Sequence, residues 1–374
     1  MSNSTDDLLP IGLSDRLPQE AAIATRVMRA VLGAMDSHGY DRVRPPLVEF
    51  EKSMAERMDG VSPRRMFRFV DPASLRTLAL RSDMTVQVSR IAATSLASAP
   101  RPLRLCYAGE VATITADQLD PARQRLQIGA ELIGSDSAAA ASEIVALAIE
   151  SLEAAGATGI SVDFTLPDLV DTLAANSLPL EGDQVEAVRR ELDTKDAGGL
   201  KAAGGAAYLP LLYATGAFDQ SIARLEALDA GGALASRIAG LKAIAARVSG
   251  PNSQVRARVT LDPTERHGFE YQSWFGFTIY AEGVRGALGR GGTYSIGGSD
   301  DPAIGFSLYV DRLIDALDSG AAKDTLFLPL SHDEVAAATL RGQGWRTIAA
   351  LSEGDDGKAL GCTHHLQAAV PVAY

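Results

Sequence analysis

Hydrophobic positions along the chain recur with two different periods, which predict helices in some stretches and strands in others. Ile23, Val27, Val31 and Met35 are spaced by four residues and predict an amphipathic helix that begins near Pro18. Shorter apolar runs, bounded by Gly, Pro, Asp or Ser, predict strands. These runs cover residues 66–70, 76–80, 103–107, 126–132, 255–261, 274–280 and 303–309.

A long block without strand patterns interrupts this series. Residues from about 168 to 250 are rich in Ala and Gly and predict helices that break at paired glycines. Because strands and helices do not alternate regularly, the simplest fold is a mostly antiparallel sheet flanked by helices, with this block as a helical insertion. We therefore expect an α+β fold with a core over residues 1–320 and a small C-terminal α/β unit over residues 321–374.

Composition narrows the possible classes of protein. The net charge of -12 disfavours a surface that holds a nucleic-acid backbone, and residues 313–374 contain four Lys/Arg against eight Asp/Glu. The two cysteines are far apart and form no disulfide framework or paired metal motif. The chain has neither a basic, apolar leader nor an apolar run of membrane-spanning length. We expect a cytoplasmic protein that binds neither tRNA nor a membrane.

An acid and a hydroxyl stand where a predicted strand ends and a helix begins. In the string 80–85, Asp83 could pair with an ammonium group while Thr85 supplies a directional hydrogen bond. The alternative is an ordinary helix N-cap at Ser82 or Asp83. Spacing alone favours the cap.

Three residues of the strand predicted near 126–132 lie on one face. Gln127, Gly129 and Glu131 share that face because side chains alternate along a strand. Polar groups on an inward face could bind an imidazole or an amino acid, with Gly129 leaving room for it. The alternative is that this face simply meets water.

Other candidate motifs carry less chemistry. The glycine-rich residues 286–294 match no phosphate-binding loop and predict a tight hairpin. Arg312 could meet an anion, although a charge pair at a helix start is the commoner role. Cys362 and His364 lack a second pair of metal ligands, and no nucleophile motif is present. We expect no catalytic residue, metal or cofactor.

The order of these strings is similar to that of the class II aminoacyl-tRNA synthetases, and specifically to the histidyl branch. Residues 12–18 resemble the family's N-terminal signature, and residues 39–49 resemble its first motif. Residues 80–85 and 127–134 resemble its two histidine-pocket motifs. Residues 102–109 and 303–313 resemble its second and third motifs. In the family, the first motif builds a dimer interface. The resemblance implies the synthetase-like sheet and self-association through the core.

Several positions depart from the family pattern. Where the second motif continues to an aromatic residue and an arginine that binds the ATP α-phosphate, this chain has Ala112 and Thr113. His267 aligns with the arginine that activates the carboxylate, and Thr293 replaces a further arginine. Tyr309 replaces a glycine, where its ring could fill adenine space. Adenylate formation depends on cations at the phosphates, so these losses should remove most of its transition-state stabilisation.

The amino-acid contacts of the family largely remain in this chain. This combination resembles the regulatory subunits of two-part ATP phosphoribosyltransferases. The resemblance implies a non-catalytic subunit that joins a short-form catalytic subunit in a hetero-oligomer. It also implies that histidine inhibits the first step of histidine biosynthesis through this subunit. The histidine-binding residues implied are Asp83, Thr85, Arg123, Gln127, Glu131 and Tyr271. Two alternatives stay open: an active histidyl-tRNA synthetase, and a stand-alone amino-acid-binding scaffold dimer.

Overall fold

The computed structural model of the protein describes residues 9–55, 66–114, 121–229, 231–250, 253, 255–266, 272–318 and 324–374. The chain divides into two compact units, Met1–Leu317 and Asp318–Tyr374. Each unit has its own sheet and its own apolar core. No helix in the described ranges combines the length and the apolar character needed to cross a bilayer.

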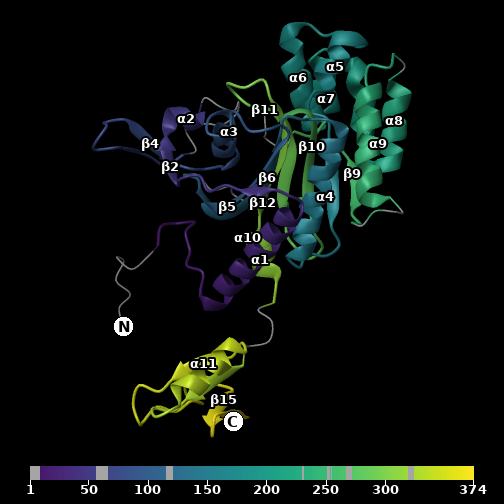
Figure 1. The fold of residues 1–374 in the computed structure, drawn as a ribbon. Coiled ribbons are helices and arrows are strands. Elements are labelled where there is room, and N and C mark those ends of the chain that lie inside the picture. The colour runs from purple at the N-terminus through teal and green to yellow at the C-terminus, as the bar shows by residue number, and fades with distance from the viewer. Residues whose placement is uncertain are drawn as a thin grey trace. The chain divides into compact units, whose positions relative to one another are not determined.

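A nine-stranded sheet forms the centre of the first unit (Figure 1). In spatial order its strands are β1 (Asp41–Arg42), β5 (Leu103–Ala112), β6 (Gln124–Ile133), β12 (Pro302–Tyr309), β11 (Gly289–Ser295), β10 (Gln272–Tyr280), β7 (Ser161–Thr165), β9 (Arg258–Leu261) and β8 (Gly216–Ala217). Neighbours are antiparallel except for the pairs β1–β5 and β7–β9. The predicted α+β fold with a mostly antiparallel sheet is confirmed.

Two helices cover one face of this sheet, α1 (Pro18–Ser37) and α4 (Ala138–Ala154). The predicted spacing of α1 is confirmed, because its buried residues are Ile23, Val27, Val31 and Met35. They pack with alternate residues of β6 and with the apolar face of α4 in the main core. This face of the sheet is therefore apolar, which leaves the polar positions of β6 to the other face.

The opposite face carries a second, smaller core. Helix α3 (Thr85–Ala93) packs there, and its Val86 and Val88 join Leu105, Ile133 and other buried residues of the sheet. A three-stranded antiparallel sheet of β2 (Val48–Phe50), β4 (Thr77–Leu80) and β3 (Arg68–Val70) precedes α3, with the short helix α2 (Glu51–Ala55) beside it. Strand β4 leads into α3, so the small sheet determines where that helix begins.

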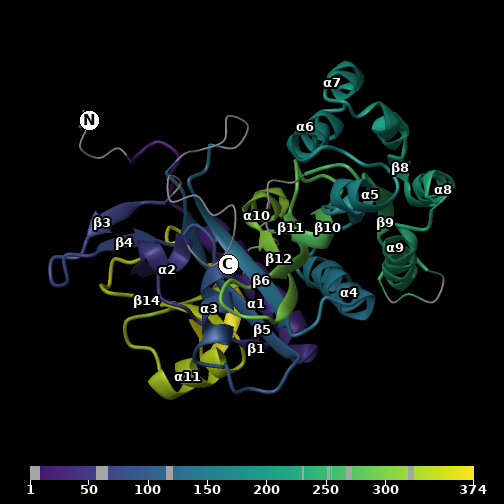
Figure 2. The same ribbon diagram turned by 90° about the horizontal axis from the view of Figure 1, so that it is seen from above.

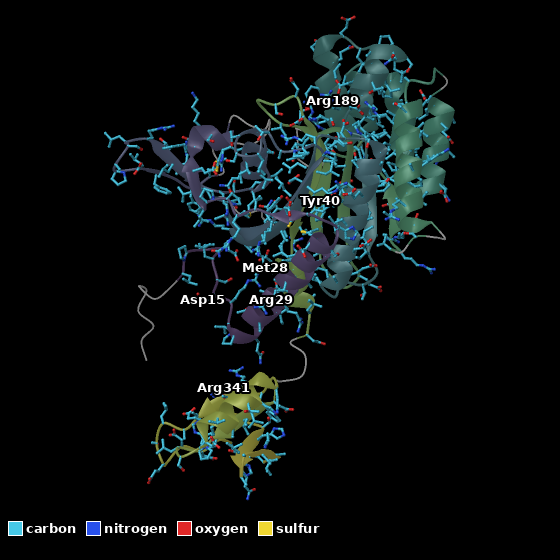
Figure 3. The ribbon with its side chains drawn as sticks, viewed as in Figure 1. Asp15, Met28, Arg29, Tyr40, Arg189 and Arg341 are labelled. Atoms are coloured by element: carbon cyan, nitrogen blue, oxygen red, sulfur yellow. The ribbon has the colours of Figure 1, made fainter. Side chains whose placement is uncertain are left out.

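The block between β7 and β9 contains α5 (Leu169–Asn176), α6 (Gly182–Asp193), α7 (Ala197–Ala202), the 3-10 helix η3 (Ala206–Tyr213), α8 (Phe218–Leu228) and α9 (Ala235–Ser249). β7 and β9 are parallel neighbours, so the chain needs a crossover between them, and these helices supply it. Figure 2 shows them gathered at the β9 end of the sheet. Arg189 of α6, labelled in Figure 3, pairs with Asp171 of α5.

Strand β7 had no counterpart among the predicted elements.

The prediction for the glycine-rich residues 286–294 was wrong in one respect. Residues from Gly289 onward form β11, a central strand, and the turn lies before them. A Cβ at Gly291 would overlap the Phe277 ring and the Gly305 carbonyl oxygen, at 2.5 Å from each. The glycines are thus required by close packing between neighbouring strands rather than by a turn.

The second unit is a four-stranded sheet with one helix. Its strands, in spatial order, are β14 (Arg346–Ala349), β13 (Thr325–Leu328), β15 (His364–Gln367) and β16 (Val370–Ala373), and α11 (Glu334–Gly342) packs on it. Strands β14 and β15 both run parallel to β13, and β16 runs antiparallel to β15.

One charged cluster ties α3 to the small sheet. The Glu49 carboxylate on β2 accepts hydrogen bonds from Gln87 Nε2 at 3.0 Å, from Arg90 Nε at 3.0 Å and from Arg90 Nη2 at 2.6 Å. The Glu49 side chain is only 10% exposed, so the cluster is shielded from water. Its bonds hold α3 against β2.

Replacing Glu49 by Ala should lower the free energy of unfolding by about 2 kcal/mol, because the Arg90 and Gln87 donors would lose their partner in a half-buried place. Urea unfolding monitored by circular dichroism measures the change. Glu51→Ala is the matched control, because Glu51 pairs with an exposed Arg68 and should contribute less than about 1 kcal/mol. Equal effects of the two substitutions would contradict the role assigned to Glu49.

Candidate functional site

The start of α3 places two polar side chains at the edge of a buried network. Asp83 is half-buried, and its Oδ1 accepts from the Thr85 backbone N–H at 2.7 Å and from Gln127 Nε2 at 3.0 Å. This bond closes a local turn with Thr85, but the predicted alternative of an N-cap at Ser82 or Asp83 was wrong, because the N-cap of α3 is Met84 and no side chain caps it. Among the described residues, none donates a hydrogen bond to the other oxygen, Oδ2, which could accept one from a cation.

Gln127 connects α3 with the centre of the sheet. Its Oε1 accepts from the Met84 backbone N–H at 2.9 Å, and its Nε2 donates to Asp83 and, at 2.8 Å, to Ser307 Oγ on β12. Both amide hydrogens are thus used within the protein. The side chain is fully buried, which excludes the alternative that this face of β6 meets water.

Glu131 is the most deeply buried acid of the network. Its Oε1 accepts from Tyr107 Oη at 3.0 Å and its Oε2 from Tyr294 Oη at 2.8 Å. The Tyr107 hydroxyl also lies 3.0 Å from Thr85 Oγ1 and 3.1 Å from Ser307 Oγ. Four strands and one helix therefore meet at a single carboxyl group.

The expectation that Gly129 leaves room for a ligand was wrong. Tyr107 lies directly opposite Gly129 on β5, and a Cβ at Gly129 would overlap the Tyr107 hydroxyl and the Phe306 carbonyl oxygen. Gly305 on β12 likewise has no room for a Cβ, because the Glu131 carboxyl fills that space. The glycines accommodate the protein's own side chains.

Three members of the network were not predicted from sequence: Tyr107, Tyr294 and Ser307. Tyr107 and Ser307 are polar residues within apolar strand segments, which is the signal that could have found them, whereas Tyr294 lies in a glycine-rich strand. Their convergence depends on the register of β5, β6, β12 and β11, and one residue of slip would turn them to the other face.

Burial favours the protonated, uncharged form of the Glu131 carboxyl group. Burial raises the pKa of Glu131 to about 8, against the hydrogen bonds from Tyr294 and Tyr107, which lower it. Burial also raises the pKa of Tyr107 and of Tyr294, and the Glu131 charge adds to the rise. Removing a carboxylate from water costs free energy that a positive group of a ligand would offset.

One of the predicted histidine-binding residues, Arg123, lies away from the network. Arg123 donates to the Thr113 and Ile11 carbonyl oxygens at 3.3 Å each, and its guanidinium lies 4.8 Å from the Phe67 ring centre. The structure does not bring it into the Asp83–Glu131 network. Tyr271 falls outside the described residues. Asp83, Thr85, Gln127 and Glu131 do come together.

The positions that correspond to nucleotide contacts in the synthetases are engaged differently. Thr113, which stands at the place of the phosphate-binding arginine, donates its backbone N–H to the Arg123 carbonyl at 2.8 Å. Arg312 Nη1 donates to the Arg285 carbonyl at 3.0 Å. The Tyr309 ring packs against the smaller core, with the Arg125 guanidinium 5.8 Å from the ring centre.

A separate hollow of about 630 Å³ lies on the helix side of the sheet. His38, Arg104, Glu143 and Arg247 line it. Arg104 and Glu143 are already joined by two hydrogen bonds of 2.7 and 2.8 Å, and the Tyr40 hydroxyl donates to Glu143 at 2.8 Å. None of the network residues lines this hollow. We place the candidate site at the network instead, because the predicted residues Asp83, Gln127 and Glu131 converge there.

Comparison with known proteins identifies the family. A family model described as histidyl-tRNA synthetase matches residues 12–313. The ATP phosphoribosyltransferase regulatory subunit of Paramagnetospirillum magneticum is 40% identical over 96% of this chain and 96% of its own length. That of Rhodospirillum centenum is 39% identical over 96% and 94%.

The chain belongs to the ATP phosphoribosyltransferase regulatory subunit family. Its fold is also that of solved relatives. A structure from Bacillus halodurans, titled as an ATP phosphoribosyltransferase regulatory subunit/histidyl-tRNA synthetase, superposes with a TM-score of 0.81 at 23% identity and covers 96% of this chain and 97% of its own. A histidyl-tRNA synthetase from Nostoc gives a TM-score of 0.76 at 17% identity, with 96% and 91% covered. This chain thus has the fold of these two structures, and its large sheet carries the network.

Glu131 should make stability depend on pH. Its pKa in the folded protein is about 8, above the ordinary 4.5, so between these values the folded state holds a proton that the unfolded state has lost. Stability therefore falls as pH rises through this window, by up to about 1.4 kcal/mol per pH unit from this group. Glu131→Gln should flatten the slope measured by urea unfolding from pH 5.5 to 7.5. Identical slopes for the two proteins would show that Glu131 titrates normally.

Proposed function

We propose that this chain is the histidine-sensing, non-catalytic subunit of an ATP phosphoribosyltransferase and that it binds histidine at the Asp83–Glu131 network. The observation that carries the proposal is the pair of acids at the two ends of one buried hydrogen-bond network, Asp83 half-buried and Glu131 fully buried. The names of the relatives support the enzyme to which the subunit belongs.

The two ends of the network suit the two cationic parts of histidine. Asp83 Oδ2 and the remaining lone pair of Gln127 Oε1 can accept from the α-ammonium group. Glu131, held by Tyr107 and Tyr294, can accept from an imidazole N–H once those side chains adjust. Tyr271 stays a prediction from the resemblance. Arg123 keeps a structural role in this proposal, because its donors are already bound to carbonyl oxygens.

The residues at the positions where the synthetases bind ATP support a subunit that catalyses no reaction itself. Adenylate formation requires cations aimed at the phosphates. The sequence has Thr113 and Thr293 where the synthetases have arginines, and the described Arg312 donates to a backbone carbonyl. ATP-dependent pyrophosphate exchange by the purified chain would contradict this part of the proposal and return the synthetase alternative.

In this proposal the subunit acts by biasing a short-form catalytic partner between active and inhibited arrangements. Histidine must then bind the two arrangements with different affinity. By thermodynamic linkage, assembly with the partner should change histidine affinity by the same factor by which histidine changes assembly. We infer self-association through the core in the same complex, as the family's first motif implies.

The direct test is ATP phosphoribosyltransferase turnover by a short-form catalytic subunit, with and without this chain, across a histidine titration. Turnover should rise on mixing and fall with histidine. Asp83→Asn keeps the acceptor for the Thr85 N–H but removes the charge that meets the ammonium, so the inhibition constant should rise by about 10- to 100-fold. Asp219→Asn, on the exposed surface of α8, is the matched control and should leave inhibition unchanged.

Two outcomes would oppose the proposal. Turnover that this chain does not alter would favour a stand-alone binding or scaffold protein. An Asp83→Asn variant that no longer assembles with the partner but keeps normal inhibition by histidine would show that histidine binds at another site.

A further inference from the structure

The two ends of the network meet at one serine hydroxyl on β12. Ser307 Oγ lies 2.8 Å from Gln127 Nε2, which belongs with Asp83 to the end proposed for the ammonium group. The same oxygen lies 3.1 Å from Tyr107 Oη, which donates to Glu131 at the end proposed for the imidazole. Ser307 therefore contacts both ends.

The register of the sheet places Ser307 in this position. Ser307 is 5% exposed and lies directly opposite Gly129 on β6, which is itself directly opposite Tyr107 on β5. Directly opposed residues of antiparallel strands point to the same face of the sheet. Because Gly129 has no side chain, the Ser307 and Tyr107 hydroxyls meet across β6.

The chemistry of these groups determines the direction of their hydrogen bonds. The Gln127 amide nitrogen can only donate, so Ser307 Oγ accepts from it. The Ser307 hydrogen then needs an acceptor, and Tyr107 Oη at 3.1 Å is nearer than Thr85 Oγ1 at 3.5 Å. A carboxylate can only accept, so an ionised Glu131 takes the Tyr107 hydrogen. Three successive hydrogen bonds therefore point the same way, from the amide to the carboxylate.

A buried series of this kind acts as a unit, because each hydrogen bond polarises the next. If the Gln127 amide shifts, Ser307 must follow it or lose a partner. A shift of Ser307 in turn alters how Tyr107 meets Glu131. The arrangement of one end therefore depends on the arrangement of the other.

A second connection between the ends runs through Thr85, but part of it is backbone. The Thr85 backbone N–H donates to Asp83 Oδ1 at 2.7 Å, and the Thr85 hydroxyl lies 3.0 Å from Tyr107 Oη. The backbone bond belongs to the turn at the start of α3 and does not depend on the hydroxyl. Through Ser307, by contrast, the ends are linked by side chains, so a single substitution can disconnect them.

We propose that Ser307 is a positioning residue that couples the ammonium end of the proposed site to the imidazole end. The inference rests on the proposed function and deepens it. The Ser307 hydroxyl holds Gln127 and Tyr107 in the arrangement in which both ends can accept from one ligand. A ligand that meets both ends then gains more affinity than the two contacts would give separately.

The experiment is a cycle of full-length variants, each titrated with L-histidine by calorimetry. Asp83→Asn weakens the ammonium end, and Tyr294→Phe removes the hydrogen bond to Glu131 Oε2 at the imidazole end. With Ser307 present, the loss of affinity in the double variant should be smaller than the product of the two single losses by about threefold or more, because linked groups do not contribute independently. In the Ser307→Ala background the two losses should multiply to within about twofold.

Ser151→Ala is the matched control for the loss of a buried hydroxyl. Ser151 is also fully buried, but it lies on α4, which covers the other face of the sheet. Its removal should leave both the affinity for L-histidine and the non-additivity unchanged. If Ser307→Ala does not fold, Ser307→Cys nearly keeps the side-chain volume, weakens the hydrogen bonds and gives the same comparison.

The outcomes separate this inference from the proposed function. Wild-type protein that does not bind L-histidine would overturn the proposed function and this inference with it. Wild-type protein that binds L-histidine, together with the same non-additivity in the presence and absence of the Ser307 hydroxyl, would overturn the coupling role alone. In that case Ser307 would only stabilise the fold, and its removal would lower the affinity of every variant by one common factor.

Discussion

The Glu131 carboxyl group, buried at the centre of the large sheet, imposes conditions on much of the first unit. A carboxyl group so far from water needs hydrogen bonds, and the Tyr107 and Tyr294 hydroxyls supply them from two other strands. Tyr107 fits only because Gly129 has no side chain, and the carboxyl fits only because Gly305 has none. The register of four strands is therefore fixed by one polar group as well as by the apolar core.

The two faces of the sheet differ in the size and polarity of the cores that they build. On the helix side, α1 and α4 bury continuous apolar surface, which supplies most of the driving force for the fold. On the other side, the apolar cluster around α3 is smaller and polar groups share the space with it. Glu49 attaches α3 to β2, and Gln127 and Tyr107 of the large sheet hold the acid and the hydroxyl at the start of that helix.

Sequence patterns predicted the parts of the fold that local periodicity determines. The four-residue spacing of α1 and the apolar runs of β5, β6, β10 and β12 have clear local signals. β7 is a short strand with a single Asp at its centre, and β11 is rich in glycine, so their strand character comes from neighbours rather than from propensity. The grouping of Asp83, Thr85, Gln127 and Glu131 followed from resemblance. The place of Tyr107 over Gly129 depends on register, which no local pattern contains.

The position of the Gln127 amide has a consequence for the molecules that the site can accept. Its two hydrogens are held by Asp83 and Ser307, and the Met84 N–H fixes its oxygen. An amide fixed in this way cannot rotate to match the hydrogen-bonding groups of a ligand. At the proposed site this oxygen would offer only a lone pair, so it would favour a ligand group that donates a hydrogen bond over an ester or ketone oxygen. A ligand of the proposed site would then be selected by the direction of its hydrogen bonds as well as by its size.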